Sequence, residues 1–251
     1  LSIKVKLIGA FTIPVLLIIL LGTISYNTAT NAITSSYTES SVSTVKKTAD
    51  YYTLMFSNIK STASEFASSS DVKSYYSGSF SADPITEESR YSSIFNSLNA
   101  TVMGNSAIKT IHVISNYGKS IFTTTNLMEV TGEYEKVKDS EEGKQIDSNR
   151  SAWFTSRSYI DTQGIGKYSV SYGRQLLGNS QRSVGYIFVD MQADYLKENL
   201  SNVDLGKNSV IGIIAPDGGE ILHSSDLELS EEQQYIYNQE FYNEAMASEE
   251  K

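Results

Sequence analysis

An uncharged apolar run occupies residues 7–26 and reads LIGAFTIPVLLIILLGTISY. Lys4 and Lys6 precede it, and the next charged residue after it is Glu39. A helix of about 20 apolar residues crosses the hydrocarbon core of a bilayer, and lysines on one flank mark the cytoplasmic side. The sequence therefore predicts a cytoplasmic N-terminus over residues 1–6, a transmembrane helix over 7–26, and a chain that faces the exterior from there on.

A cleaved export signal is the alternative interpretation of this run, because two lysines followed by an apolar core also describe a signal peptide. Against it, the run is long, and no A-x-A cleavage site follows it directly; the best small-residue candidate is the weak site at residues 30–32. Pro14 lies inside the run, where neighbouring helices or a local kink can accommodate its missing donor. The membrane anchor is therefore the preferred interpretation.

The composition narrows the class of function. The chain has 251 residues and a formal net charge of -9; an acidic exterior argues against nucleic acid as a partner, because phosphates require a basic face. There are no cysteines, which excludes thiolate catalysis, cysteine zinc sites and iron–sulfur clusters, and leaves the exterior part to be held together by packing alone. The chain has 17 tyrosines and one tryptophan, and tyrosine suits both half-buried strands and ligand pockets.

Apolar residues recur in steps of three or four over residues 33–76, as one stripe of a long amphipathic helix. The polar side is rich in Ser and Thr, which are mediocre helix formers, so packing must stabilise this helix. The stripe is interpreted either as a core face or as a dimer seam, since its spacing also suits a coiled coil. Further helices are predicted over residues 91–98, 133–147 (short and solvated), 193–200 and 231–251.

Alternating or β-branched runs that predict strands occupy residues 108–115, 120–125, 167–176, 184–191, 209–215 and 220–223. The first two are expected to form a hairpin around Asn116-Tyr117-Gly118, and the last two a hairpin around a Pro-Asp-Gly-Gly turn. Helices followed by a meander of strands indicate an α+β fold with an antiparallel sheet. A hairpin and one helix cannot close a core of their own, so we expect the sequence to be a fragment that ends inside a second module.

The chain also carries motifs in a fixed order. After the apolar run and the long helix come Trp153-Phe154, Tyr159-Ile160-Asp161, GYIFVD at 185–190, LGK at 205–207 and IIAPDG at 213–218. In order and spacing this set, which covers nearly the whole chain, resembles the double Cache (dCache) sensing region of bacterial methyl-accepting chemotaxis proteins. The resemblance implies a membrane-distal module over residues 27–202, with a PAS-like antiparallel sheet on the long helix and a ligand site, and the truncated start of a membrane-proximal module over 203–251.

The resemblance also implies the site residues. Family members that bind amino acids or amines carry an arginine two residues before the tryptophan, an aromatic residue after it, then Tyr-x-Asp, and an aspartate that ends a later strand. Phe154, Tyr159, Asp161 and Asp190 fit this pattern. Ser151 stands in the place of the arginine, with Arg150 one position away, so the ligand class stays open among amino acids, amines and carboxylates.

The candidate ligand-binding residues are Arg150, Trp153, Phe154, Tyr159, Asp161, Tyr172, Arg174 and Asp190. The aspartates can form charge-assisted hydrogen bonds to an ammonium group, the rings can add cation–π faces, and either arginine can hold a carboxylate as a fork. Each residue also has a structural interpretation: the tryptophan as core filler, Arg150 as a solvated helix end, Asp161 as a turn residue and Asp190 as a helix cap.

No enzyme motif is present. His112 and His223 are isolated and lack the H-E-x-x-H spacing, so neither a zinc site nor a catalytic triad is predicted, and His112 is interpreted as a strand residue. We expect no catalysis, cofactor or metal. The expected function is small-molecule sensing by a chemoreceptor that dimerises through the long helix and signals to cytoplasmic partners. The alternatives are the sensor of a histidine kinase or a cyclic-dinucleotide enzyme, and an anchored adhesion or structural module.

Overall fold

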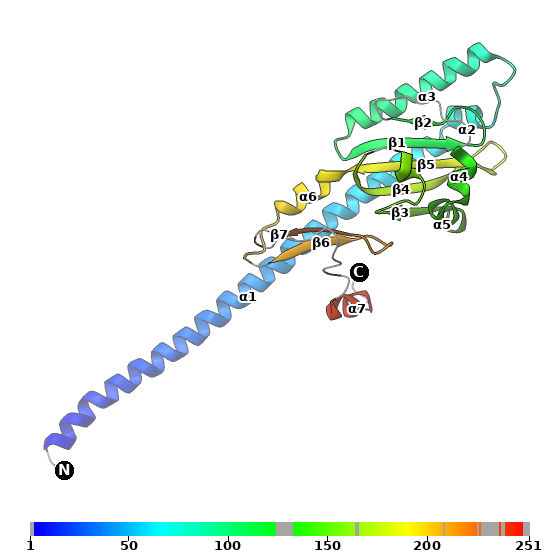
Figure 1. Cartoon of the computed structure of the whole chain (residues 1–251). Coiled ribbons are helices and arrows are strands. Elements are labelled where there is room, and N and C mark those ends of the chain that lie inside the picture. Colours follow the sequence, from blue (N-terminus) through cyan, green and yellow to red (C-terminus); the bar gives the residue numbers. More distant parts are fainter. Residues whose placement is uncertain are drawn as a thin grey trace. The chain divides into compact units, whose positions relative to one another are not determined.

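The computed structural model describes residues 3–123, 133–163, 166–207, 209–224, 226, 236 and 239–247. Its elements, in chain order, are α1 (Ile3–Ser68), α2 (Ser70–Tyr76), α3 (Pro84–Gly104), β1 (Ile108–Ser115), β2 (Ile121–Phe122), α4 (Glu133–Asp139), α5 (Glu141–Asn149), β3 (Ser151–Phe154), the 3-10 helix η1 (Ile160–Gln163), β4 (Tyr168–Leu177), β5 (Ser183–Gln192), α6 (Ala193–Ser201), β6 (Val210–Ile214), β7 (Glu220–Ser224) and α7 (Glu240–Ala247) (Figure 1). The fold is α+β, as the sequence predicted. Parts of two predicted elements, residues 124–125 of the first hairpin and most of 231–239 and 248–251 of the last helix, lie outside the described residues.

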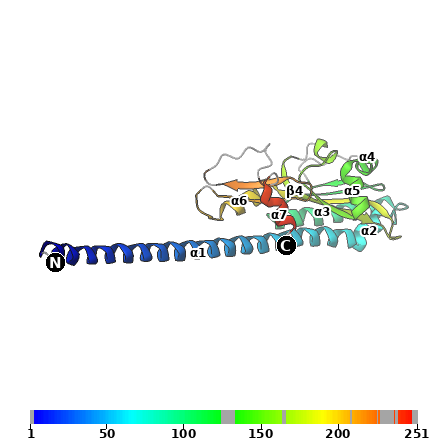
Figure 2. The same ribbon diagram turned by 90° about the horizontal axis from the view of Figure 1, so that it is seen from below.

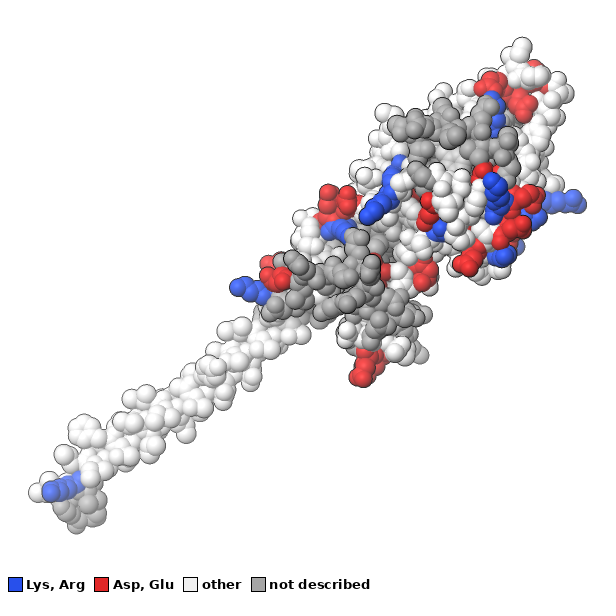
Figure 3. Space-filling model, in the orientation of Figure 1, with Lys and Arg blue, Asp and Glu red and all other residues white. Residues whose placement is uncertain are grey.

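The chain divides into two compact units, Leu1–Tyr52 and Thr53–Lys251. The first unit is the N-terminal part of α1, which contains the whole apolar run and continues through Pro14 without interruption. The two threonine hydroxyls of the apolar run bond inside the helix: Thr12 Oγ1 donates to the carbonyl of Ile8 at 2.8 Å, and Thr23 Oγ1 to that of Ile19 at 2.9 Å. This helix is long and apolar enough to cross a membrane, and Figure 3 shows it as an uncharged stretch next to a basic end.

The second unit is built on a five-stranded sheet with the order β2-β1-β5-β4-β3, in which every pairing is antiparallel. β5 is the central strand, and its residues from Gly185 to Met191 are buried. The register places Asp190 of β5 opposite Thr110 of β1 on one side and opposite Ser171 of β4 on the other. Three polar side chains therefore lie in one row across the end of the sheet.

The two faces of the sheet are covered by different helices. From Thr53 onward, α1 covers one face, where Met55, Ile59 and Ala63 of the predicted stripe are buried. This part of the stripe is therefore a core face. α4 and α5 cover the opposite face (Figure 2), over a core cluster of Ile114, Phe122, Val137, Ile146, Phe154, Ile160, Tyr186 and Phe188.

Three predicted helices differ from the structure. The long helix ends at Ser68 rather than at residue 76, because Ser69 has an extended ψ of 134° and α2 begins after it. The helix predicted over 91–98 is the longer α3, capped by Asp83, which accepts from the amides of Ile85 and Thr86 at 3.2 and 3.3 Å. The prediction of a solvated helix over 133–147 was wrong: two helices form there, and their buried side chains include Val137 and Ile146.

Both predicted hairpins form, β1 with β2 and β6 with β7. In the first turn Gly118 has a φ of 73°, and a Cβ atom there would lie 2.7 Å from the ring of Tyr75. Glycine is thus required both by the backbone conformation and by the close contact. The second turn uses Gly218 at a φ of 83°, which agrees with the turn signal of the sequence.

Candidate functional site

The carboxylate of Asp190 is the centre of a buried polar cluster. Arg157 binds it as a fork, with Nη1 donating to Oδ1 at 2.7 Å and Nη2 donating to Oδ2 at 3.0 Å. His112 Nε2 lies 2.9 Å from Oδ2, and Thr110 Oγ1 donates to the same oxygen at 3.1 Å. Asp190 is 1% exposed and His112 0%. Removing these groups from water is costly, and the charge-assisted bonds offset that cost.

Arg157 joins Asp190 to a second carboxylate. Its Nε donates to Asp161 Oδ1 at 2.9 Å, and its backbone amide donates to Asp161 Oδ2 at 2.8 Å. Nη1 also donates to Ser171 Oγ at 3.0 Å, and the guanidinium carbon lies 4.4 Å from the ring centroid of Tyr168. The Asp190 cluster, as we call it below, consists of Thr110, His112, Arg157, Asp161, Tyr168, Ser171 and Asp190.

Glu142 of α5 holds the loop that carries Arg157. Its carboxylate accepts hydrogen bonds from the amide of Ser158 at 3.0 Å, from the Ser158 hydroxyl at 2.6 Å, and from the amides of Tyr159 and Ile160 at 2.9 and 3.1 Å. Glu142 is 2% exposed, so this carboxylate is committed to the loop. It is a positioning residue, because it fixes the backbone from which Arg157 and Asp161 reach Asp190.

The ionisation of the cluster follows from these contacts. Burial alone would raise the pKa of Asp190, but the adjacent His112 ring and the Arg157 guanidinium outweigh it, so the pKa lies well below its usual range. Burial likewise opposes ionisation of Glu142, yet the hydrogen bonds from Ser158, Tyr159 and Ile160 lower its pKa. His112 Nδ1 is buried without a hydrogen-bond partner among the described residues, whereas Nε2 faces the carboxylate of Asp190.

Acid should therefore destabilise this unit through its lowered carboxylate pKa values. A carboxyl group whose pKa is lower in the folded chain than in the unfolded chain stabilises the fold at every pH above its unfolded pKa, which is about 3.9 for Asp and 4.3 for Glu. This stabilisation is lost as the pH falls from that value through the folded-state pKa. We expect the free energy of unfolding to drop below about pH 4, and to drop less steeply in Glu142→Gln. Urea titrations followed by the emission of Trp153 measure both slopes.

The matched control for the acid experiment is Glu88→Gln. The Glu88 side chain is 58% exposed and binds Lys119 at 2.9 Å, and surface pairs of this kind contribute little to stability. The free energy of unfolding of Glu88→Gln should fall with decreasing pH as steeply as that of the wild-type chain. An unchanged slope in Glu142→Gln would contradict the assignment of the acid sensitivity to the buried carboxylates.

The structure brings only part of the predicted site together. Phe154, Tyr159, Asp161 and Asp190 lie on the side of α4 and α5, and Arg157 joins the two aspartates. Trp153, Tyr172 and Arg174 lie on the α1 face: the Trp153 ring is 5.1 Å from Phe56 and 4.9 Å from Tyr172, and Arg174 Nη1 donates to Ser64 Oγ. Arg150 ends α5 as its C-cap, with a φ of 65°. Consecutive strand residues point to opposite faces, so Trp153 and Phe154 do not share one pocket.

The sequence interpretation missed five members of the cluster: Thr110, His112, Arg157, Tyr168 and Ser171. His112 is a strand residue, as expected, but it is also a partner of Asp190. The alternation in β1 places Thr110 and His112 on one face, which was a usable signal. Their distance to Asp190 depends on the pairing of β1 with β5, for which no sequence motif exists.

Sequence comparisons add no relative. No protein-family model matches the chain, and no curated protein matches it. Within the part of the chain that the structure describes, no group of three or more His, Asp or Glu side chains is arranged to hold a metal ion. A function is therefore inferred below from the geometry of the residues themselves.

Proposed function

We propose that this chain is the extracytoplasmic small-molecule sensing region of a membrane receptor of the double Cache chemoreceptor type. Three features support the proposal: an apolar helix long enough to cross a membrane, its continuation into an α+β unit, and a buried ionic cluster on the sheet of that unit. The lysines before the span orient the N-terminus to the cytoplasm. On this proposal, residues 27–202 are the membrane-distal module, and the β6–β7 hairpin begins a membrane-proximal module over 203–251.

The Asp190 cluster is the observation that carries the proposal. Well-packed apolar side chains often stabilise a core as well as a buried ion pair does, or better. Perturbed ionisable groups gather at functional sites instead. Two carboxylates, Asp161 and Asp190, contact the guanidinium of Arg157, so the cluster already holds one cationic group of the chain. A binding role explains the cluster better than a role in stability alone.

The ligand class that fits is an amine or an amino acid. The ammonium group of the ligand would take the place of the Arg157 guanidinium on Asp190, against the ring of Tyr168 that now faces Arg157 at 4.4 Å. The displaced Arg157 would then be free to hold the carboxylate of an amino acid as a fork. Arg157 thus acts as an internal occupant of the site in the unliganded chain.

Displacement of Arg157 has a path to the second hairpin. Thr155, two residues before Arg157, donates from its backbone amide and from Oγ1 to Asp217 Oδ2 in the β6–β7 turn, the latter at 2.9 Å. A ligand shifts such an equilibrium only by its differential affinity for the two arrangements. We propose that the shift displaces the long helix within a homodimer and so crosses the membrane. Histidine-kinase and cyclic-dinucleotide receptors would share this sensor and differ in their cytoplasmic output.

A thermal-unfolding screen of the whole chain in lipid nanodiscs tests the proposed function. Amines, amino acids and carboxylates are added one at a time; a ligand at 100 times its Kd stabilises by about 2.7 kcal/mol. We expect at least one amine or amino acid to raise the Tm, and Asp161→Asn to reduce the response. The control Asp71→Asn, whose side chain is 54% exposed and pairs with Arg90, should keep it. A screen without any stabilising compound would favour the adhesion or structural module.

A further inference from the structure

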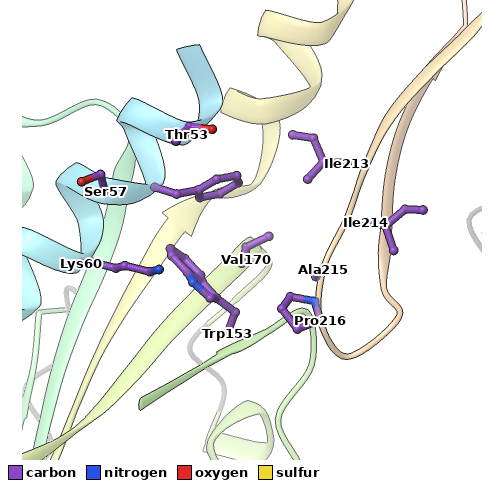
Figure 4. A pocket seen from close by; sticks show the side chains of 10 residues that line it. Thr53, Ser57, Lys60, Trp153, Val170, Ile213, Ile214, Ala215 and Pro216 are labelled. Atoms are coloured by element: carbon purple, nitrogen blue, oxygen red, sulfur yellow. The ribbon is translucent and has the colours of Figure 1, made fainter. Parts of the chain in front are cut away.

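A cavity lies on the other face of the sheet from the Asp190 cluster. Its volume is about 500 Å³, within the range of roughly 300–1,000 Å³ that small-molecule sites occupy. Figure 4 shows Lys60 of α1, Trp153 of β3 and Val170 of β4 on one side, and Ile213 and Pro216 of the second hairpin across from them. All of the lining residues belong to the unit Thr53–Lys251.

The cavity has apolar walls and one cation. Phe56 and Trp153 form an edge-to-face pair with ring centroids 5.1 Å apart, and Val170 and Ile213 extend the apolar lining. Lys60 Nζ lies 5.9 Å from the centroid of the Trp153 ring, and its ammonium has no carboxylate partner among the described residues. Apolar walls around a few placed polar groups are typical of a ligand site.

Neighbouring acids do not neutralise this lysine. Asp217 follows Pro216, but its carboxylate accepts hydrogen bonds from Thr155 and from the amide of Gly219. No aspartate or glutamate is among the lining residues. The charge of Lys60 is therefore available to an anion that enters from solvent.

We propose that this cavity binds a small carboxylate with an apolar aromatic body, with the ring between Trp153 and the hairpin and the carboxylate at Lys60. A ring of this kind stacks on or against Trp153 and Phe56, and the lysine supplies a charge-assisted hydrogen bond. The site is separate from the Asp190 cluster, and its ligand is an anion, whereas the ligand proposed for the Asp190 cluster carries a positive charge. It bridges the sheet and the β6–β7 hairpin, so its occupancy stabilises their packing.

Trp153 is the single tryptophan of the chain, so its fluorescence reports on this cavity directly. The experiment titrates the whole chain in nanodiscs with 4-phenylbutyrate and follows tryptophan emission, with 4-phenylbutanamide and 4-phenylbutylamine as neutral and cationic analogues. We expect a saturable change with the carboxylate, and weaker binding of both analogues. Lys60→Met should weaken the binding of 4-phenylbutyrate about fivefold to tenfold. The effect is limited because the lysine is exposed to solvent.

Two further comparisons make the result decisive. Lys144→Met removes an exposed lysine of α5, on the other face of the sheet, and should leave the affinity unchanged. Lys60→Met should keep the thermal response to amines that the wild-type chain shows, so that the fate of this proposal is separate from that of the proposed amine sensor. The absence of a saturable change, equal binding of acid, amide and amine, or equal losses in Lys60→Met and Lys144→Met would each overturn the proposal.

Discussion

Replacing Arg157 by methionine should lower the free energy of unfolding by about 3–5 kcal/mol, the usual cost of breaking a buried ion pair from one side. The substitution keeps most of the side-chain volume. It leaves Asp190, 1% exposed, with His112 and Thr110 as its remaining partners among the described residues. It also removes the hydrogen bond from Arg157 Nε to Asp161 Oδ1. Urea unfolding of the whole chain, followed by Trp153 emission, measures the loss.

The same variant should respond to a small cation that replaces the missing guanidinium. We expect millimolar methylguanidinium to restore part of the lost stability in Arg157→Met and to have no such effect on the wild-type chain. Arg182→Met is the control: Arg182 is exposed in the turn between β4 and β5, and its loss should change stability by less than about 0.5 kcal/mol. Equal stabilities of the two variants would show that the fork on Asp190 contributes nothing.

Removing the charge of Asp190 should weaken the binding of any amine or amino acid more than a hundredfold, which corresponds to about 2.8 kcal/mol at 1.4 kcal/mol for each factor of ten. Asp190→Asn keeps the shape of the side chain and one acceptor oxygen, so it tests the charge rather than the packing. Asp161 lies farther out, with a side chain 31% exposed, and Asp161→Asn should cost less. Affinities of both variants are measured below their own unfolding temperatures.

Arg157→Met has the opposite expected effect on a simple alkylamine. If the arginine occupies the cation position, its removal takes away an internal competitor, and the apparent affinity rises in proportion to the fraction of open sites. An amino acid gains less from this substitution, because it also loses the proposed partner of its carboxylate. The contrast between the two ligand classes separates competition by Arg157 from a general loosening of the site.

The sequence predicted well what depends on local pattern. The apolar run at residues 7–26 lies within a single helix, and the alternation in β4 and β5 placed both strands to within two residues. The glycine of the Asn116-Tyr117-Gly118 turn was recognisable because its conformation is set by neighbouring residues alone. Local signals are sufficient where periodicity and turn chemistry decide the structure.

The site was predicted in part, because its geometry depends on long-range pairing. Asp190 could be singled out as an acid at the end of an apolar strand, on the same face as Phe188. Its partner Arg157 lies 33 positions away in sequence and comes close only when β3, β4 and β5 align. The prediction for α4 and α5 was wrong for a similar reason. The sequence around Glu142 is charged and indicates an exposed helix, but the Glu142 carboxylate is buried because it accepts hydrogen bonds from Ser158 and from the amide of Tyr159.

Isothermal titration calorimetry on the whole chain in nanodiscs measures whether Asp190 recognises the ligand, with the most stabilising amine or amino acid of the screen as that ligand. We expect saturable binding to the wild-type chain and to Asp71→Asn, and no measurable binding to folded Asp190→Asn. The same affinity in all three proteins would contradict this expectation, because the carboxylate at the end of β5 would then have no part in recognition.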